Sequence, residues 1–206
     1  MTGYGTATAS SAPGSRAGMA NLILQLRGLS NLGTDDYTLG TVTYWTDSHV
    51  QTALDNHRTD IFREELDNSN INYVSSGSIE YKDYRSRFSN LETTTGGTAI
   101  FIVETAAGTN IGTDTYSVDY SNGIVTFTAD QIGTAYFLTA RSYDLNAVAA
   151  ECWRMKAGAY GEAVNFSTDN MRINRGDLIK NCLLMADYYS GLQDSIVVDL
   201  ARDDCL

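Results

Sequence analysis

The sequence predicts an α+β protein, in which an antiparallel β domain is inserted into a small helical bundle. Two features of the chain predict this arrangement. Apolar residues recur at helical spacings of three and four over residues 18–67 and 142–191. Over residues 68–141, alternation of polar and apolar residues replaces that period, and glycines beside Thr, Ser or Asn mark the turns. We therefore expect N-terminal helices and a C-terminal helix pair around an inserted β-barrel or sandwich.

The N-terminal region begins with a polar stretch and continues as a helix. Residues 1–17 are mostly Gly, Ser, Thr and Ala, with little apolar surface to bury, so we expect a flexible arm that orders on contact. A helix is predicted from Gly18, and Gly33 lies just past its end. Its apolar face consists of Met19, Leu22, Ile23, Leu26 and Leu29.

Three further elements complete the N-terminal half. Alternation around Leu39-Gly40-Thr41 predicts a short hairpin. Thr46 or Asp47 is suited to cap a second helix, because a short oxygen-bearing side chain can accept a bond from the first turn. Residues 61–66 then lead out of this half as extended chain. The apolar face of the second helix consists of Val50, Ala53, Leu54 and His57.

The middle of the chain predicts six strands. Asn122-Gly123 separates two alternating runs and indicates a hairpin, because both residues tolerate positive φ. Short strands with turns between them favour a compact antiparallel sheet, rolled into a barrel or sandwich. The predicted strands are residues 71–74, 79–88, 99–105, 115–120, 124–129 and 135–141.

The C-terminal half predicts two amphipathic helices joined by a miniature hairpin. Asp144 caps the first helix and Gly161 ends it, whereas Asn174 caps the second and Gly191 ends it. Between the helices, residues 165–173 place apolar side chains on either side of a Ser-Thr-Asp-Asn turn. The two apolar faces consist of Leu145, Val148, Cys152, Met155 and Ala159, and of Leu178, Cys182, Met185 and Tyr189.

Side chains of the first C-terminal helix predict close helix packing. Ala149, Ala150 and Trp153 lie beside its apolar face. We expect the alanines to be small because another helix, in the same subunit or a neighbour, approaches closely there.

The helix pair is also where the chain resembles a known family. Residues 142–153 read Ser-Tyr-Asp-Leu-Asn-Ala-Val-Ala-Ala-Glu-Cys-Trp, and residues 165–169 read Asn-Phe-Ser-Thr-Asp. This pattern resembles head–tail adaptor (connector) proteins of tailed bacteriophages, which carry an Ala-rich helix, a Phe-Ser-x-Asp turn and a second helix with a polar cap. Residues 44–47 and 54–58 are similar to the N-terminal half of that family. The resemblance covers residues 19–67 and 142–190, and Asn174 stands where Ser is usual.

The resemblance implies a structural protein of the virion neck, made in the host cytoplasm. Such adaptors form a ring, usually of twelve copies, beneath the portal protein. The ring extends the DNA channel and offers a platform for the next neck or tail protein, a stopper or tail-tube component. DNA passes through without sequence-specific binding. Two alternatives stay open: a carbohydrate- or receptor-binding β module, and a hydrolase whose carboxylates meet only in the fold.

The C-terminal segment, residues 192–206, follows a helix that has already ended. Ile196, Val197, Val198 and Leu200 make it apolar and rich in β-branched residues. One interpretation is a strand or turn packed on the same subunit. The other is an arm that adds to a neighbouring sheet or groove, as extended peptides do through backbone hydrogen bonds. Adaptors of the resembled family use this segment in a similar way, which makes the portal its expected partner.

Charge and cysteine content narrow the function classes. The formal net charge of −11 argues against binding of nucleic-acid phosphates as the main role, which requires clustered Lys and Arg. The three cysteines have no zinc-ligand spacing, and we expect them to be reduced. We expect no signal peptide, because the N-terminus has no basic region followed by an apolar core, and no membrane span, because no apolar run approaches the required length.

Groups that could carry chemistry are scattered along the chain, and we predict no catalytic residue, cofactor or metal. His49 and His57 lie too far apart on a helix to share a metal. Asp114, Asp119 and Asp130 could border a calcium loop, although without EF-hand spacing.

The carboxylate pairs Glu64-Glu65 and Asp203-Asp204 are typical of a solvated face. Aromatic residues alternate with basic ones over residues 81–88, which indicates either a binding stripe or, more simply, an edge strand.

Overall fold

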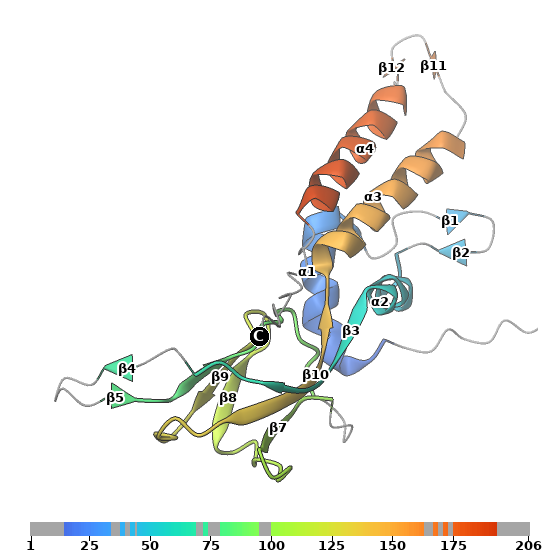
Figure 1. Cartoon of the computed structure of the whole chain (residues 1–206). Coiled ribbons are helices and arrows are strands. Elements are labelled where there is room, and N and C mark those ends of the chain that lie inside the picture. Colours follow the sequence, from blue (N-terminus) through green and yellow to red (C-terminus); the bar gives the residue numbers. More distant parts are fainter. Residues whose placement is uncertain are drawn as a thin grey trace, which may run out of the picture. The chain divides into compact units, whose positions relative to one another are not determined.

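The computed structural model describes residues 15–33, 38–39, 42–43, 45–68, 72–73, 79–94, 100–162, 167–168, 171–172 and 175–192. These residues form a mixed α+β structure of helices and antiparallel sheets, as the sequence predicts (Figure 1). Contacts divide the chain into two compact units, with the boundary between Tyr143 and Asp144. The predicted N-terminal arm lies almost entirely outside the described residues.

The first unit begins with a short 3₁₀ helix, η1 (Ala17–Met19), that continues into α1 (Ala20–Ser30). Four of its five predicted face residues, Met19, Leu22, Ile23 and Leu26, are buried. The helix ends at Ser30, three residues before Gly33, because Asn31 adopts a left-handed conformation with φ of 49°. Its N–H donates to the Arg27 carbonyl, which closes the last turn.

The next elements follow the sequence prediction closely. Strands β1 (Thr38–Leu39) and β2 (Val42–Thr43) pair as the expected hairpin. Helix α2 (Asp47–Asn56) is capped by Thr46, whose side chain accepts a bond from the His49 N–H at 3.4 Å. The apolar face of α2 is buried through Val50, Ala53 and Leu54.

A long two-stranded ribbon connects the helices of this unit to its sheets. Strand β3 (Arg58–Glu65) pairs with β10 (Tyr136–Tyr143), which also pairs with β7 (Ile102–Thr105). The β3–β10 register shifts by one residue, so that Phe62 and Arg63 together face Thr139. At this bulge Arg63 has φ of 49°, and the Phe62 side chain is 81% exposed.

The second sheet has the order β6–β9–β8, formed by β6 (Asp83–Arg85), β9 (Ile124–Phe127) and β8 (Tyr116–Asp119). Neither three-stranded sheet closes into a barrel, so the expected barrel is wrong. The physical reason is that the strands are too few and too short, because a barrel closes only when tilted strands continue around it. A single bridge between Asp67 and Arg85 joins the end of β3 to β6. Strands β4 (Asn72–Tyr73) and β5 (Ile79–Glu80) pair as a separate two-stranded sheet.

Both sheets contribute to one hydrophobic core, which is rich in aromatic rings. Phe127 stacks on Tyr136 with 4.7 Å between ring centroids, and Tyr84 meets both rings edge-on at 5.3 Å. The Tyr84 hydroxyl donates to the Thr134 carbonyl at 3.0 Å, which satisfies its polar end. The core consists of Ile61, Leu66, Tyr84, Leu91, Phe101, Val103, Tyr116, Val125, Phe127, Tyr136, Leu138 and Ala140.

All six predicted strand regions contain strands, with two local differences. The predicted strand over residues 79–88 is interrupted at Tyr81 and Lys82. The Asn122-Gly123 hairpin between β8 and β9 is confirmed, but only Gly123 has positive φ, at 66°. The Asp119 carboxylate accepts bonds from the N–H groups of Ser121 and Asn122, which gives a wider, four-residue loop.

Hydrogen bonds tie α1 to the β region within the first unit. The Gly18 carbonyl accepts bonds from the N–H and the hydroxyl of Thr93, at 3.3 and 3.0 Å. A Cβ at Gly18 would lie 2.3 Å from the Thr93 carbonyl oxygen, so only glycine permits this approach. The expected grouping of residues 18–67 with 142–191 as one helical core stays a prediction.

The second unit is the predicted helix pair, and Figure 1 shows its two helices antiparallel. It comprises α3 (Leu145–Glu162) and α4 (Arg175–Gly191), joined by a chain that includes β11 (Ser167–Thr168) and β12 (Met171–Arg172). The paired strands β11 and β12 confirm the miniature hairpin. Asp144 caps α3 by accepting a bond from the Ala147 N–H at 2.9 Å, as predicted.

The buried faces of the two helices differ from their predicted stripes. On α3 Met155 is 43% exposed, whereas the buried residues are Leu145, Ala147, Val148, Ala149, Ala150, Cys152, Lys156 and Ala157. On α4 the buried residues are Cys182 and Ala186, and the predicted Leu178 is exposed.

The glycine in the β8–β9 turn gives a first prediction. Gly123→Ala places a Cβ 2.1 Å from the Phe88 carbonyl oxygen and forces alanine to a φ of 66°. We expect the free energy of unfolding to fall by about 1–3 kcal/mol, measured by urea denaturation. Gly28→Ala is the matched control, because α1 has open space there, and it should raise stability by up to about 1 kcal/mol. Equal effects of the two substitutions would contradict the assignment of the turn.

Candidate functional site

The most highly organised group of polar side chains lies in the first unit, around Glu92. We call Arg16, Asp55, Glu92, Arg141 and Tyr143 the Glu92 cluster. The Arg16 guanidinium donates to both Asp55 oxygens, at 2.6 and 2.9 Å, and its Nε donates to Glu92 Oε1 at 3.0 Å. The Tyr143 hydroxyl donates to Glu92 Oε2 at 2.6 Å. Arg141 Nη1 lies 3.7 Å from the same oxygen.

The members of the cluster come from several parts of the first unit, with Arg141 and Tyr143 both on β10. Arg16 immediately precedes η1 in extended conformation, and its N–H donates to Gln51 Oε1 on α2 at 2.6 Å. Asp55 lies near the end of α2. The Glu92 N–H donates to the Arg141 carbonyl at 2.9 Å, and Tyr143 is the last residue of β10. The cluster therefore joins segments that are far apart in the sequence.

Burial controls the electrostatics of the cluster. Glu92 is fully buried, so its charge requires partners inside the protein. Asp55, followed by Glu92, favours the charged guanidinium and raises the pKa of Arg16. Burial, and then the bond to Glu92, raises the pKa of Tyr143, because both disfavour the phenolate. The cluster holds fixed charges in a closed arrangement, which suits a structural connection.

Sequence reasoning did not identify the Glu92 cluster, because its members are scattered along the chain. One signal for it was present. Arg16 is the only charged residue among residues 1–26. A lone charge beside an apolar helix indicates a specific partner, although it does not identify Glu92 or Asp55.

The alternating aromatic and basic residues over 81–88 do not form one binding surface. Tyr84 is buried in the core between the sheets. Lys82 pairs with Glu80 at 2.6 Å, and Arg87 lies 3.6 Å from Glu64. The burial of Tyr84 removes the central aromatic residue that a glycan or a base would stack on.

The other candidate groups act locally. The Asp119 carboxylate accepts a bond from the Asn122 side-chain amide at 2.7 Å and further bonds from backbone N–H groups of its loop, and these bonds lower its pKa. Asp130 accepts bonds from the N–H groups of Tyr81 and Ile132, which lower its pKa. In the described part of the chain, no three His, Cys, Asp or Glu side chains gather as a metal site.

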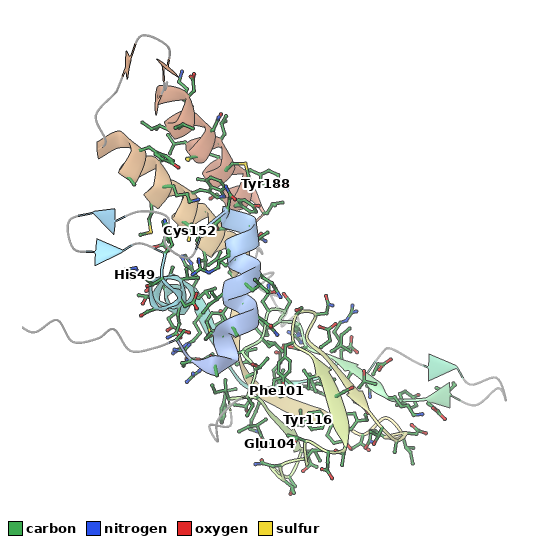
Figure 2. The ribbon with its side chains drawn as sticks, turned by 180° about the vertical axis from the view of Figure 1, so that it is seen from behind. His49, Phe101, Glu104, Tyr116, Cys152 and Tyr188 are labelled. Atoms are coloured by element: carbon green, nitrogen blue, oxygen red, sulfur yellow. The ribbon has the colours of Figure 1, made fainter. Side chains whose placement is uncertain are left out.

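The two histidines lie at opposite ends of α2. His49 is exposed in its first turn (Figure 2), and His57 follows its last residue. Asp203 and Asp204 lie outside the described residues.

The predicted helix-packing residues lie on α3. Ala149 and Ala150 are fully buried, and Trp153 is half-buried with the Lys156 ammonium 5.1 Å from its ring centroid. Close approach of another helix at these alanines stays a prediction. The predicted portal-binding residues Ile196, Val197, Val198 and Leu200 lie outside the described residues.

Helix α4 carries a second set of apolar side chains that sequence reasoning missed. Leu184 and Tyr188 lie four residues apart on α4 and are 66% and 59% exposed. Leu192, just past the end of the helix at Gly191, continues this spacing and is 45% exposed. Figure 2 labels Tyr188 on this helix, whose buried face is formed by Cys182 and Ala186. Residues four apart share a face, so α4 has one apolar face directed inward and a second that is exposed. The four-residue spacing of these side chains is visible in the sequence, but the predicted apolar face consisted of Leu178, Cys182, Met185 and Tyr189 instead.

Comparisons with protein-family models, with curated proteins and with solved structures find no match to this chain. Within the described ranges, no helix combines the length and apolar character that crossing a membrane requires.

The Glu92 cluster gives a second prediction. Glu92→Gln keeps the side-chain size but removes the buried charge that Arg16 and Tyr143 face. We expect a loss of about 3–5 kcal/mol in the free energy of unfolding, measured by urea denaturation. Asp60→Asn removes a carboxylate from exposed ion pairs with Arg58 and Arg141, so it should cost at most about 1 kcal/mol. If both substitutions cost the same, the cluster does not stabilise the unit as described.

The buried tyrosines give a third prediction, on alkaline stability. Burial raises the pKa of Tyr84 to about 12, from an ordinary value of 10.0. As pH rises above 10, the unfolded chain loses this proton first, so the unfolded state is favoured. The free energy of unfolding should therefore be maximal below pH 10 and fall between pH 10 and 12, with Tyr143 acting in the same direction. Urea denaturation across this range measures the slope, and a flat profile would contradict burial of these hydroxyls.

Proposed function

We propose that this protein is a structural component of a tailed-virus neck, a head–tail adaptor that assembles with copies of itself into a ring. The observation that carries the proposal is the second apolar face of α4, formed by Leu184 and Tyr188 and continued by Leu192 just past the end of the helix. An exposed apolar stripe opposite a buried one is typical of a helix that packs against a neighbour on both sides.

The distribution of charge supports self-association through the helix pair. Residues 144–192 contain six acidic and five basic side chains, whereas residues 1–143 contain fifteen acidic and eight basic ones. Copies of a nearly neutral segment approach one another with little like-charge repulsion. A contact between two different faces of the same helix pair is heterologous, and heterologous contacts close into rings.

The position of the ring in the particle rests on the resemblance to adaptor proteins over residues 142–153 and 165–169. In this proposal the ring, usually of twelve copies, sits beneath the portal protein and carries the next neck or tail component. The C-terminal segment, residues 192–206, is the proposed portal contact. DNA passes through the ring without sequence-specific binding, and the acidic first unit suits a channel wall that does not retain phosphates. The role is structural and not enzymatic.

Assembly tests the proposal directly, and this is the fourth prediction. The purified protein, alone and with portal-bearing heads, should form rings in negative-stain electron microscopy. Leu184→Gln with Tyr188→Gln removes the second apolar face and should lower the assembled fraction by at least about tenfold, measured by analytical ultracentrifugation.

The matched control is Leu24→Gln on α1, which replaces an equally exposed leucine outside the helix pair and should leave assembly unchanged. A protein that stays monomeric on portal-bearing heads would refute the adaptor function. If rings still form with both substitutions, the contact between subunits does not use this face of α4.

A further inference from the structure

We propose that Asp55, Glu92 and Tyr143 form a binding socket for a guanidinium group, and that Arg16 in this socket is a latch on the chain segment that leads into the helix pair. We call these three residues with Gln51 the Arg16 socket. The inference rests on the first unit alone and does not depend on the proposed function.

The socket matches the shape of a guanidinium group. Asp55 accepts two parallel bonds from Nη1 and Nη2, at 2.9 and 2.6 Å, and Glu92 accepts from Nε at 3.0 Å. The Tyr143 oxygen lies 3.1 Å from Nη2 and accepts a further bond there, because its own proton is directed to Glu92. All three guanidinium nitrogens are therefore recognised. An ammonium group, a compact point charge, cannot reproduce this planar fork.

The socket also depends on a cation to remain stable. Glu92 is fully buried, and without Arg16 its nearest cation would be Arg141, 3.7 Å away. A buried carboxylate without a partner is strongly destabilising, so an empty socket favours entry of another guanidinium. The side chains of Arg16 and Asp55 are about one-third exposed, at 33% and 28%, so a small cation has access from solvent.

The contacts around Tyr143 explain why the socket acts as a latch. The segment from Asn90 to Glu92 runs along the end of β10, through the Leu91–Ser142 bridge and a 3.2 Å bond from the Tyr143 N–H to the Asn90 carbonyl. Arg16 fastens this end to α2 through Asp55. When Arg16 leaves, the Tyr143 side chain loses one partner and Glu92 loses its main counter-charge. The end of β10, which continues into Asp144, is then held by fewer bonds.

The test is chemical rescue of the full-length chain. Arg16→Ala keeps Cβ and removes two methylene groups and the guanidinium, which are the atoms that ethylguanidinium can replace. Hydrogen exchange at the amides of Glu92 and Tyr143 should become at least about tenfold faster in this variant, whereas amides of β8, β9 and α4 should not change. Millimolar ethylguanidinium should restore slow exchange and the melting temperature. Ethylammonium, with the same charge but no fork, should not, and neither cation should alter the wild-type protein.

Two further variants keep the proposal falsifiable. Arg16→Ala with Glu92→Gln removes both charges and should not respond to ethylguanidinium. If Arg16→Ala fails to fold, Arg16→Lys carries the test, because it keeps the charge without the fork and should still accelerate exchange at Glu92 and Tyr143. Equal rescue by the two cations, rescue of the double variant, or wild-type exchange in Arg16→Lys would each overturn the proposal.

Discussion

The first unit depends on one buried charge, the Glu92 carboxylate. Its desolvation is offset only where Arg16 Nε and the Tyr143 hydroxyl both reach it, at 3.0 and 2.6 Å. That requirement fixes where the chain enters α1 and where β10 ends. The aromatic core between the sheets is non-directional by comparison, since ring packing tolerates small displacements that a charged hydrogen bond does not. Directional polar contacts thus align the helices with a β region that is stabilised mainly by burial.

The periodic elements were largely predictable from sequence. Helical spacing, alternation and cap chemistry identified α1, α2, the six strand regions and the helix pair, because these signals are local. Thr46 and Asp144 cap their helices as expected. The end of α1 and the shape of the β8–β9 loop differed, because side-chain bonds and a left-handed Asn31 override residue preference there.

Long-range features were not predictable in the same way. The Glu92 cluster joins residues up to 127 positions apart, and no local pattern encodes such a meeting. Barrel closure failed as a prediction because strand alternation reports one buried face and gives no information on whether a sheet closes. On α4 the sequence contained two apolar periods, Leu178 with Cys182 and Leu184 with Tyr188, and period alone does not show which one is turned inward.

The bulge at Phe62 and Arg63 has a consequence for solubility. Strand β3 lies at the edge of its sheet, where unpaired backbone groups can template a strand from another molecule. The extra residue breaks the regular spacing of those groups, and the exposed Asp60 and Glu65 add charge along the same strand. A foreign strand cannot follow this edge in continuous register. Molecules crowded at high concentration are therefore protected from fibrous aggregation along β3, so any ordered contact between them has to use another surface.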